Sequence, residues 1–239
     1  MREVESFSAG GVLGAGFSIY FRNLPMLGLL TAVGFAPYGA YMLWSPLESS
    51  IFADLVVELL IYIVCGALVE GGLAYGVVTS LRGAQDVDLW KIFGRSLRVL
   101  PRITMLSFVV GLLILIGLFF LIVPGIFVIL MLFVAVPASV MEGGGIQKAL
   151  KRSEELTNGF WGGLFVVLLV ITVPAEVLSF LLDLGVTRGF EPLFGEILNF
   201  FITDFLFAGI GATCAAVAYH DLRILKDGVD TEQVAAAFD

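Results

Sequence analysis

The segment "VPASVMEGGGIQKALKRSEELTNGFW", residues 136–161, interrupts an almost continuously apolar chain. The apolar run ends at Glu142, three glycines follow, and a short charged segment leads back to apolar sequence at Phe160. Within 145–157, apolar residues recur at three- and four-residue spacing opposite a charged face, which is typical of an amphipathic helix. The positions on the apolar face are Ile146, Ala149, Leu150 and Ser153. The stretch therefore predicts a short helix that turns out of the preceding apolar segment at Glu142 and the glycines.

The composition places the chain in a membrane. Of its 239 residues, 59% are hydrophobic and 14% are charged, and the mean hydropathy is +1.02. A soluble domain carries about 45–50% apolar and about 25% charged residues, because it must cover its surface. The net charge of −8 disfavours nucleic acid as a partner. Cys65 and Cys214 both lie in apolar segments, so we expect neither a disulfide framework nor a cysteine metal site.

Six apolar segments are candidates for crossing the bilayer. They cover residues 24–43, 55–80, 103–123, 126–141, 160–182 and 196–219. Between the third and fourth, Pro124 removes a backbone donor and Gly125 permits a tight reversal. The sequence therefore predicts an all-α, polytopic membrane protein with six transmembrane helices.

The basic residues predict the orientation. With six spans and a cytoplasmic N-terminus, Arg188 is the only one of the 13 lysines and arginines on the outer side. Cytoplasmic loops carry an excess of Lys and Arg, so this distribution favours both the number of spans and cytoplasmic placement of both termini.

A second amphipathic segment, 88–102, precedes the third predicted span. Its apolar stripe consists of Leu89, Phe93, Leu97 and Leu100. Its basic stripe consists of Lys91, Arg95, Arg98 and Arg102. Such helices lie in the membrane interface, with the apolar face in the bilayer and the cations toward anionic headgroups. We expect membrane lipids as partners of this stripe, with simple positive-inside anchoring as the plainer role.

Three helical-hairpin repeats are a hypothesis drawn from the same pattern. Each unit contains an amphipathic segment followed by two apolar segments. The units are 7–80, 88–141 and 146–219. Their matching serines are Ser18, Ser96 and Ser153. All belong to a single integral membrane domain, 1–239, with 220–239 as a cytoplasmic tail.

The stretch 137–161 and the C-terminal stretch "AYHDLRILKDGVD", 218–230, share a pattern with a known group of proteins. The matching positions are Pro137, Glu142, Gly143, Ala149, Leu150, Ser153, Leu156, Thr157, Gly159, Trp161, Tyr219, Asp221 and Arg223. They resemble the membrane domain found with some glycerophosphoryl diester phosphodiesterases, and related stand-alone prokaryotic membrane proteins. That group ends in Tyr-Tyr-Asp-Leu-Arg, whereas His220 replaces the second tyrosine here.

This resemblance implies a prokaryotic plasma (inner) membrane location but no activity. In the fused members of the group, catalysis belongs to a separate soluble barrel domain that the 239 residues do not contain. We therefore expect no phosphodiesterase activity and no cofactor.

No catalytic constellation is apparent in the sequence. A hydrolase needs a nucleophile with a base, or a ligated metal. His220 is the only histidine, and its place at the end of the last predicted span favours an interfacial or capping role. The paired glutamates of "SEEL", 153–156, resemble those of CAAX-type intramembrane proteases, but the arginine and histidines of such sites are missing. The sequence predicts a non-enzymatic protein without a catalytic or metal site.

Three acids, Glu70, Glu176 and Asp204, lie deep in predicted spans, where a carboxylate is costly and normally faces protein or water. No cation lies at a similar depth, so the alternatives are hydrogen bonding in the protonated form and a proton- or cation-coupled path. At 1.5 Å per residue, Glu176 and Asp204 lie about 24 Å and about 22 Å from the cytoplasmic ends of their spans. We expect these two to be neighbours and Glu70 to lie apart.

Small residues four apart, Gly72 with Gly76 and Gly209 with Thr213, permit close helix packing within the chain or between copies. The leading functional hypothesis is a non-enzymatic membrane module or scaffold that contacts lipids and a partner, either a second copy or another membrane protein. The alternative is a small proton- or cation-coupled transporter that uses the intramembrane carboxylates.

The orientation can be tested with Gln85→Cys and Gln147→Cys on a background without Cys65 and Cys214. Both cysteines should react with a membrane-impermeant maleimide only after permeabilisation, because the basic residues place both segments in the cytoplasm. Arg188→Cys is the positive control and should react in intact cells. Labelling of either glutamine position in intact cells would reverse the orientation.

Overall fold

The computed structural model describes residues 6–44, 51–82, 89–186, 195, 198–200 and 206–228. The principal helices are α1 (Ala9–Arg22), α2 (Leu24–Trp44), α3 (Ile51–Leu81), α4 (Leu89–Phe120), α5 (Ile122–Met131), α6 (Ala135–Glu142), α7 (Ile146–Thr157), α8 (Trp161–Val186) and α10 (Leu206–Asp227). None of the described residues is in a β-strand, so the predicted all-α class is confirmed.

Five helical stretches in the described part of the chain are long and apolar enough to cross a membrane. They are Leu24–Met42, Phe52–Leu81, Leu89–Phe120, Ile122–Glu142 and Trp161–Gly185. Of the sixth predicted span, 196–219, most of the first ten residues lie outside the described residues, and α10 begins at Leu206. The helical membrane-protein character is therefore supported, and six spans stay a prediction.

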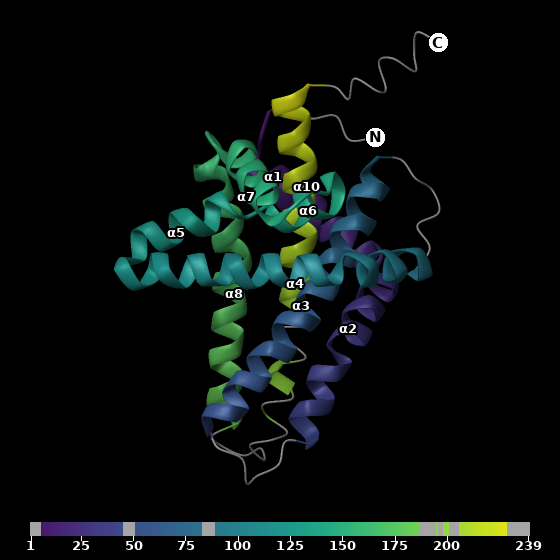
Figure 1. Ribbon diagram of the computed structural model, residues 1–239, viewed down its shortest axis with the longest axis vertical. Coiled ribbons are helices and arrows are strands. Elements are labelled where there is room, and N and C mark those ends of the chain that lie inside the picture. The colour runs from purple at the N-terminus through teal and green to yellow at the C-terminus, as the bar shows by residue number, and fades with distance from the viewer. Residues whose placement is uncertain are drawn as a thin grey trace.

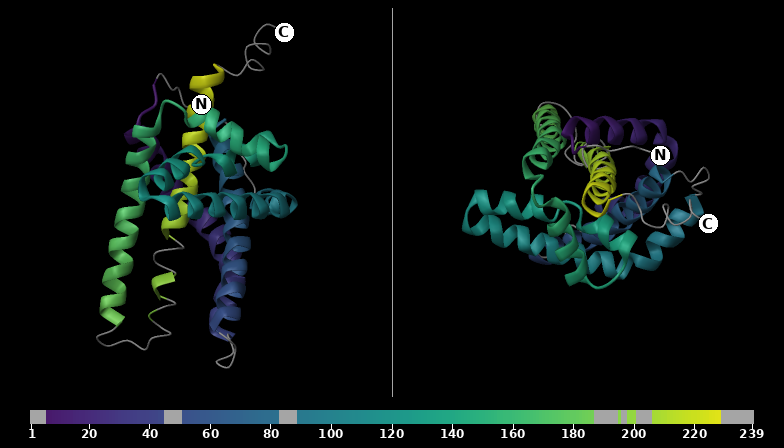
Figure 2. Two further views of the ribbon diagram at one scale, coloured as in Figure 1. Left: turned by 60° about the vertical axis from the view of Figure 1, so that its left-hand side comes forward. Right: turned by 90° about the horizontal axis from the view of Figure 1, so that it is seen from above.

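The α4–α5 pair differs most from the expected arrangement. Figures 1 and 2 show α2, α3, α8 and α10 extending along the length of the molecule, while α4 lies across them with α5 folded back along it. The predicted boundary between 102 and 103 is wrong, because α4 is one continuous helix of 32 residues, about 48 Å long. Its buried positions continue through that boundary at three- and four-residue spacing. They are Ile92, Ser96, Val99, Ile103 and Leu106.

The buried side of α4 packs against α3. A Cβ added to Gly72 would lie 2.7 Å from Ser96 Oγ, and one added to Gly76 would lie 3.0 Å from Ile92 Cδ1. The small face of α3 is therefore covered within the chain. Of the predicted apolar stripe, Leu97 does not take part in this packing and is 47% exposed.

The reversal between α4 and α5 occurs at Leu121, the residue before α5, so Pro124 lies in the first turn of α5. Gly125 has no positive φ and is needed for a different reason. A Cβ on Gly117 would lie 3.0 Å from Gly125 Cα, and one on Gly125 would lie 2.9 Å from the backbone nitrogen of Leu118. The two glycines thus allow the two helix backbones to come into contact.

The fourth predicted span, 126–141, is broken. A turn at residues 132–134 separates α5 from α6, and Ala135 N–H donates to the carbonyl of Leu132 at 3.0 Å instead of continuing the helix. A second corner follows α6, where Gly143 and Gly144 have φ values of 70° and 91°. Such values are easily reached only by glycine. This corner and the separate helix α7 confirm the helix predicted from 145–157.

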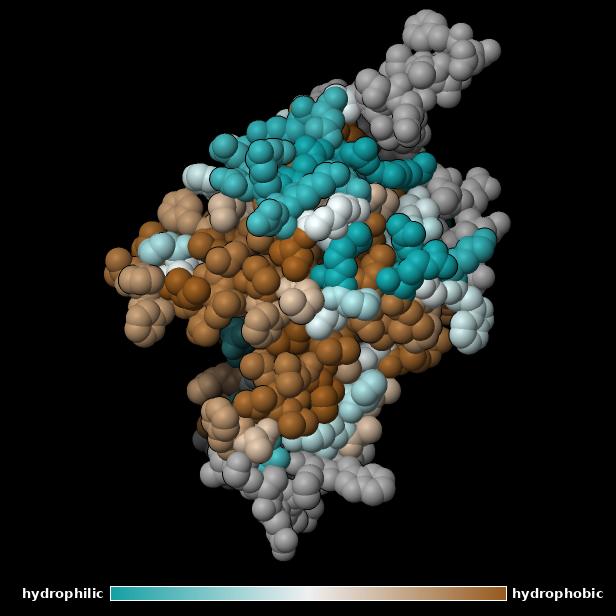
Figure 3. All heavy atoms as spheres, in the orientation of Figure 1, coloured by the Kyte–Doolittle hydropathy of each residue, from teal (hydrophilic) through white to brown (hydrophobic). Residues whose placement is uncertain are grey.

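The predicted apolar face of α7 meets the rest of the bundle. Ala149 is buried in a cluster with Leu106, Leu132 and Ala135, and Ile146 and Leu150 pack at its edge. Figure 3 shows hydrophilic residues gathered at the end of the molecule that α7 and the C-terminal part of α10 form, above a broad hydrophobic surface. The molecule thus has one distinctly polar end.

The three-unit repeat stays a prediction. Its first and third units each contain a short helix followed by longer ones, but in the second unit the short helix is merged into α4. Ser96 and Ser153 are buried, whereas Ser18 is exposed. The three serines therefore do not occupy equivalent environments.

Spin labels test the direction of α4. If α2, α3 and α8 cross the bilayer, labels at the exposed positions Leu97 and Phe119 should report similar depths, because α4 lies across those helices. An α4 that spanned the membrane would separate the two labels by about 33 Å. Depth is measured by electron paramagnetic resonance from collisions with oxygen and a polar nickel complex.

Spin labels at Val166 and Val177 of α8 are the control for this experiment, because both positions are exposed and apolar like Leu97 and Phe119. The two α8 positions are 11 residues apart and should differ in depth by about 16 Å. A depth difference between Leu97 and Phe119 larger than that of the α8 pair would contradict the crosswise arrangement.

Candidate functional site

The two stretches that carry the predicted family resemblance, whose matching residues we call the family pattern, come together at the polar end. Glu142 at the end of α6 accepts hydrogen bonds from Arg152 Nε of α7, at 2.9 and 3.1 Å to its two oxygens. The hydroxyl of Tyr219 on α10 donates to Glu142 Oε1 at 2.9 Å. Arg152 Nη2 also donates to Asp227 at the end of α10. We call Glu142, Arg152, Tyr219 and Asp227 the polar latch, because these four side chains join three helices.

The Arg152–Glu142 pair of the latch is largely shielded from water, whereas Asp227 at its edge is 41% exposed. The side chains of Arg152 and Glu142 are 18% and 19% exposed. Burial alone lowers the pKa of Arg152, but hydrogen bonds and charge from Asp227 and Glu142 outweigh it and raise the pKa above its ordinary value. The guanidinium therefore stays charged and can hold both carboxylates at once, a geometry to which the planar fork of arginine is suited.

A second contact of α7 provides hydrogen bonds to a backbone carbonyl at the break between α5 and α6. The carbonyl of Met131 accepts hydrogen bonds from Ser153 Oγ at 2.8 Å and from Thr157 Oγ1 at 3.2 Å. Both hydroxyl residues are buried. A backbone carbonyl left free by a broken helix would cost about 1–3 kcal/mol if buried without a partner. Two residues of the family pattern thus stabilise an irregular segment of backbone.

The other pattern residues have structural positions around these contacts. Gly143 and Gly159 adopt positive φ at the two ends of α7. Trp161 packs edge-on against Phe127 of α5, with ring centroids 5.4 Å apart. Pro137 is buried in α6. These residues hold α7 against α5 and α6.

The C-terminal pattern residues lie on a buried part of α10. Asp221 is 1% exposed, and Arg223 Nε lies 3.7 Å from Asp227 Oδ2. His220 is 7% exposed, with Nδ1 3.5 Å from Asp221 Oδ1. His220 is therefore packed inside the protein, on a helix that also contacts α1 and α3. The expected interfacial or capping role stays a prediction.

The predicted basic stripe is divided between two environments. Arg102 Nη2 donates to the carbonyl of Ser139 at 2.6 Å, and Arg95 lies over the ring of Tyr75. Lys91 and Arg98 are exposed and form no ion pair with any described residue. Two of the four cations thus bind the protein itself, and two are available at its surface.

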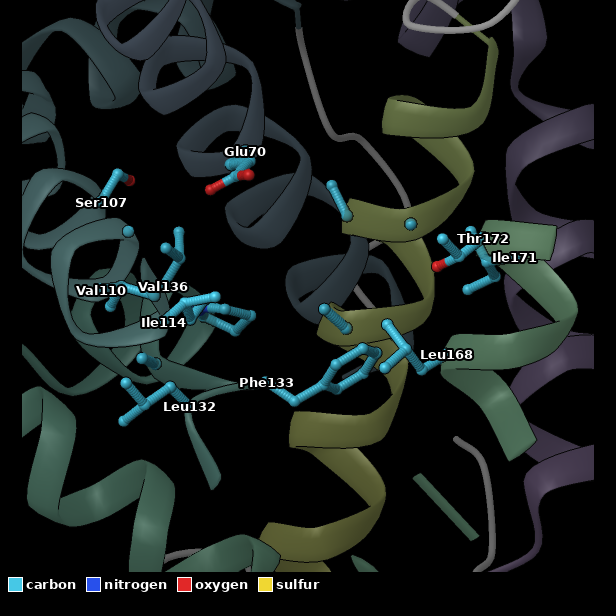
Figure 4. A pocket seen from close by; sticks show the side chains of 16 residues that line it. Glu70, Ser107, Val110, Ile114, Leu132, Phe133, Val136, Leu168, Ile171 and Thr172 are labelled. Atoms are coloured by element: carbon cyan, nitrogen blue, oxygen red, sulfur yellow. The ribbon is translucent and has the colours of Figure 1, made fainter. Parts of the chain in front are cut away.

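Glu70 lines a cavity of about 430 Å³ between α3, α4, α6, α8 and α10. Figure 4 shows its carboxylate at one end of the cavity, with the hydroxyl of Ser107 at the same end and Phe133 at the opposite end. Glu70 forms no hydrogen bond or ion pair with another described residue. It is the only ionisable side chain among the described residues that line the cavity.

The predicted pairing of Glu176 with Asp204 falls partly outside the described residues, because Asp204 is not among them. Glu176 is exposed on α8 and does not line the Glu70 cavity. The predicted neighbourhood of Glu176 with Asp204 and the separate position of Glu70 both stay predictions.

Two members of the polar latch do not belong to the family pattern. Arg152 stands on the charged face of α7 in the sequence, and Asp227 lies in the C-terminal stretch. One feature of the sequence indicates that Arg152 can be partly buried: it lies next to Ser153 and three residues after Ala149, at the edge of the buried face of α7.

In the described part of the chain, no group of three or more His, Cys, Asp or Glu side chains could hold a metal ion.

Replacement of Arg152 by leucine tests the latch. Arg152→Leu leaves two carboxylates close together without their shared cation, so the free energy of unfolding should fall by about 3 kcal/mol. The measurement is denaturant-induced unfolding of the purified protein, followed by circular dichroism. The neighbouring Lys151→Leu is the control, because Lys151 is 78% exposed and lies 4.0 Å from Glu155, so the change should be below about 1 kcal/mol. Equal effects of the two replacements would show that the latch does not stabilise the fold.

Comparison of the chain with protein-family models, with curated proteins and with solved structures finds no match. The resemblance to the phosphodiesterase-associated membrane domain therefore stays a prediction that rests on the two stretches quoted above.

Proposed function

We propose that the protein is a non-enzymatic membrane module whose helices α4 and α5 form a platform in the interface of one leaflet, where α4 contacts anionic lipids. The supporting observation is the crosswise direction of α4 together with the side chains that it exposes. A partner, either a second copy or another membrane protein, belongs to the same proposal.

One side of α4 exposes large apolar residues along its whole length. At 100° per residue their positions fall within an arc of about 100°, so they share one face of the helix. They are Trp90, Leu97, Met105, Phe108, Leu112, Leu115, Ile116 and Phe119. An apolar face of this length is unfavourable in water, and contact with lipid removes it from water. Trp90, which is 80% exposed, is a residue type enriched at the membrane–water interface.

The two surface cations lie beside this apolar face. At 100° per residue, Lys91 and Arg98 stand about 80–100° around the helix from Trp90. A helix lying flat in the interface can therefore immerse its apolar face while both cations reach headgroups. Each basic residue near an anionic surface contributes about 1 kcal/mol, so these two supply preference for anionic lipid.

Transport coupled to protons or cations is the second candidate. Glu70 in its cavity favours it, since an intramembrane carboxylate facing open space is a typical element of an ion path. Glu176, exposed on α8, contributes nothing to that cavity. Lipid contact is therefore the better supported of the two functions.

The lipid proposal is tested with the Lys91→Ala, Arg98→Ala double variant in vesicles of mixed phosphatidylcholine and phosphatidylglycerol. Its preference for a spin-labelled phosphatidylglycerol over the matching phosphatidylcholine should fall by up to about 30-fold at low salt, from two losses of about 1 kcal/mol. The same preference in the native protein should weaken as salt is raised.

Lys148→Ala, Lys151→Ala is the matched control, with two cations removed from the exposed side of α7. The proposal requires a smaller effect from this pair than from the α4 pair. An unchanged lipid preference in the α4 variant would refute direct contact between α4 and anionic headgroups.

A further inference from the structure

The cavity beside Glu70 has the walls of a binding site for an apolar chain. Its volume of about 430 Å³ falls in the range of about 300–1,000 Å³ typical of small-molecule sites. Thirteen of the 16 lining residues carry no polar side-chain group. The three exceptions are Glu70, Ser107 and Thr172. Figure 4 shows Val110, Ile114 and Val136 on one side of α10 and Leu168 and Ile171 of α8 on the other.

Two of the three polar lining residues, Glu70 and Ser107, belong to α3 and α4, and the third, Thr172, belongs to α8. Ser107 Oγ is fully buried and has no hydrogen-bond partner among the described residues, and Figure 4 shows it on the Glu70 side of the cavity. Glu70 itself is exposed although its neighbours Val69 and Gly71 are packed inside the bundle, and it lines the cavity. A carboxylate and a hydroxyl thus lie unpaired at one end of an apolar space.

The charge decides which class of ligand fits. No described cation lines the cavity, so an anionic headgroup would meet only repulsion from Glu70. A bare calcium ion takes six to eight oxygen ligands, and magnesium takes six, whereas the lining offers one carboxylate and two hydroxyls. An organic ammonium ion is already surrounded by carbon and needs no such cage, and a chain attached to it would contact the apolar walls.

We infer that the cavity binds a single-chain amphiphile with an organic ammonium headgroup, whose cation pairs with Glu70 and whose chain lies between α4 and α8. The volume, at the lower end of the usual range, suits one chain rather than a two-chain lipid. This inference does not depend on the lipid contacts of the platform, which lie on the outer side of α4.

The test measures binding of tritiated dodecyltrimethylammonium to the full chain in uncharged maltoside micelles. Dodecanol, with the same chain and no charge, is measured in parallel. The native protein should bind the ammonium probe saturably, and Glu70→Gln should weaken that binding about tenfold or more while leaving dodecanol unchanged. Equal loss for both probes, or no loss for either, would overturn the inference.

Two further variants place the site. Glu176→Gln removes an exposed acid from α8 outside the cavity and should change neither probe; a loss equal to that of Glu70→Gln would show unspecific surface binding and overturn the site. Gly111 lines the cavity, and a Cβ there meets no atom within 4 Å. Gly111→Leu should therefore fold, fill part of the space and weaken both probes. If Glu70→Gln does not fold, the binding of the two probes to Gly111→Leu tests the site by itself. Undiminished binding in that variant would refute the site.

Discussion

The contact of Glu142 with Arg152 determines how the polar end of the molecule is arranged. It closes the corner that Gly143 and Gly144 open, and so sets the direction in which α7 leaves α6. Because Arg152 also reaches Asp227, α10 is held to the same point. Once α7 has this position, its hydroxyl residues face the carbonyl of Met131, and the break between α5 and α6 is stabilised.

This chain of contacts explains why α4 can lie across the bundle. A helix pair folded sideways must leave the bundle and return to it, and the return requires an irregular segment. Unpaired backbone groups are tolerated at membrane depth only where protein covers and satisfies them. The turn at 132–134 meets this condition because α7 lies against it. The direction of the α4–α5 pair and the residues of the polar latch are therefore parts of one arrangement.

The sequence predicted those features of the fold that depend on neighbouring residues along the chain. The all-α class, helix α7 and its glycine corner follow from apolar periodicity and from residues that break it. The direction of α4 could not be predicted in this way, since residues 103–120 carry no charged side chain and their composition suits a helix that crosses the bilayer as well as one that lies along it. The family resemblance marked Glu142, Ser153 and Tyr219, but their contacts join positions up to 77 residues apart. Arg152 stands on the charged face of this helix in the sequence, where the pattern does not distinguish it from an exposed charged residue.

The crosswise α4–α5 pair has a consequence for the shape of the membrane around the protein. If the pair lies in one leaflet, it occupies area there and none in the other. A bilayer relieves such an imbalance by bending toward the leaflet with the smaller area, and interfacial helices are correspondingly sensitive to curvature. The close backbone contact at Gly117 and Gly125 keeps the pair narrow, which limits this imbalance. Molecules of this kind should accumulate where the membrane is already bent in the matching direction.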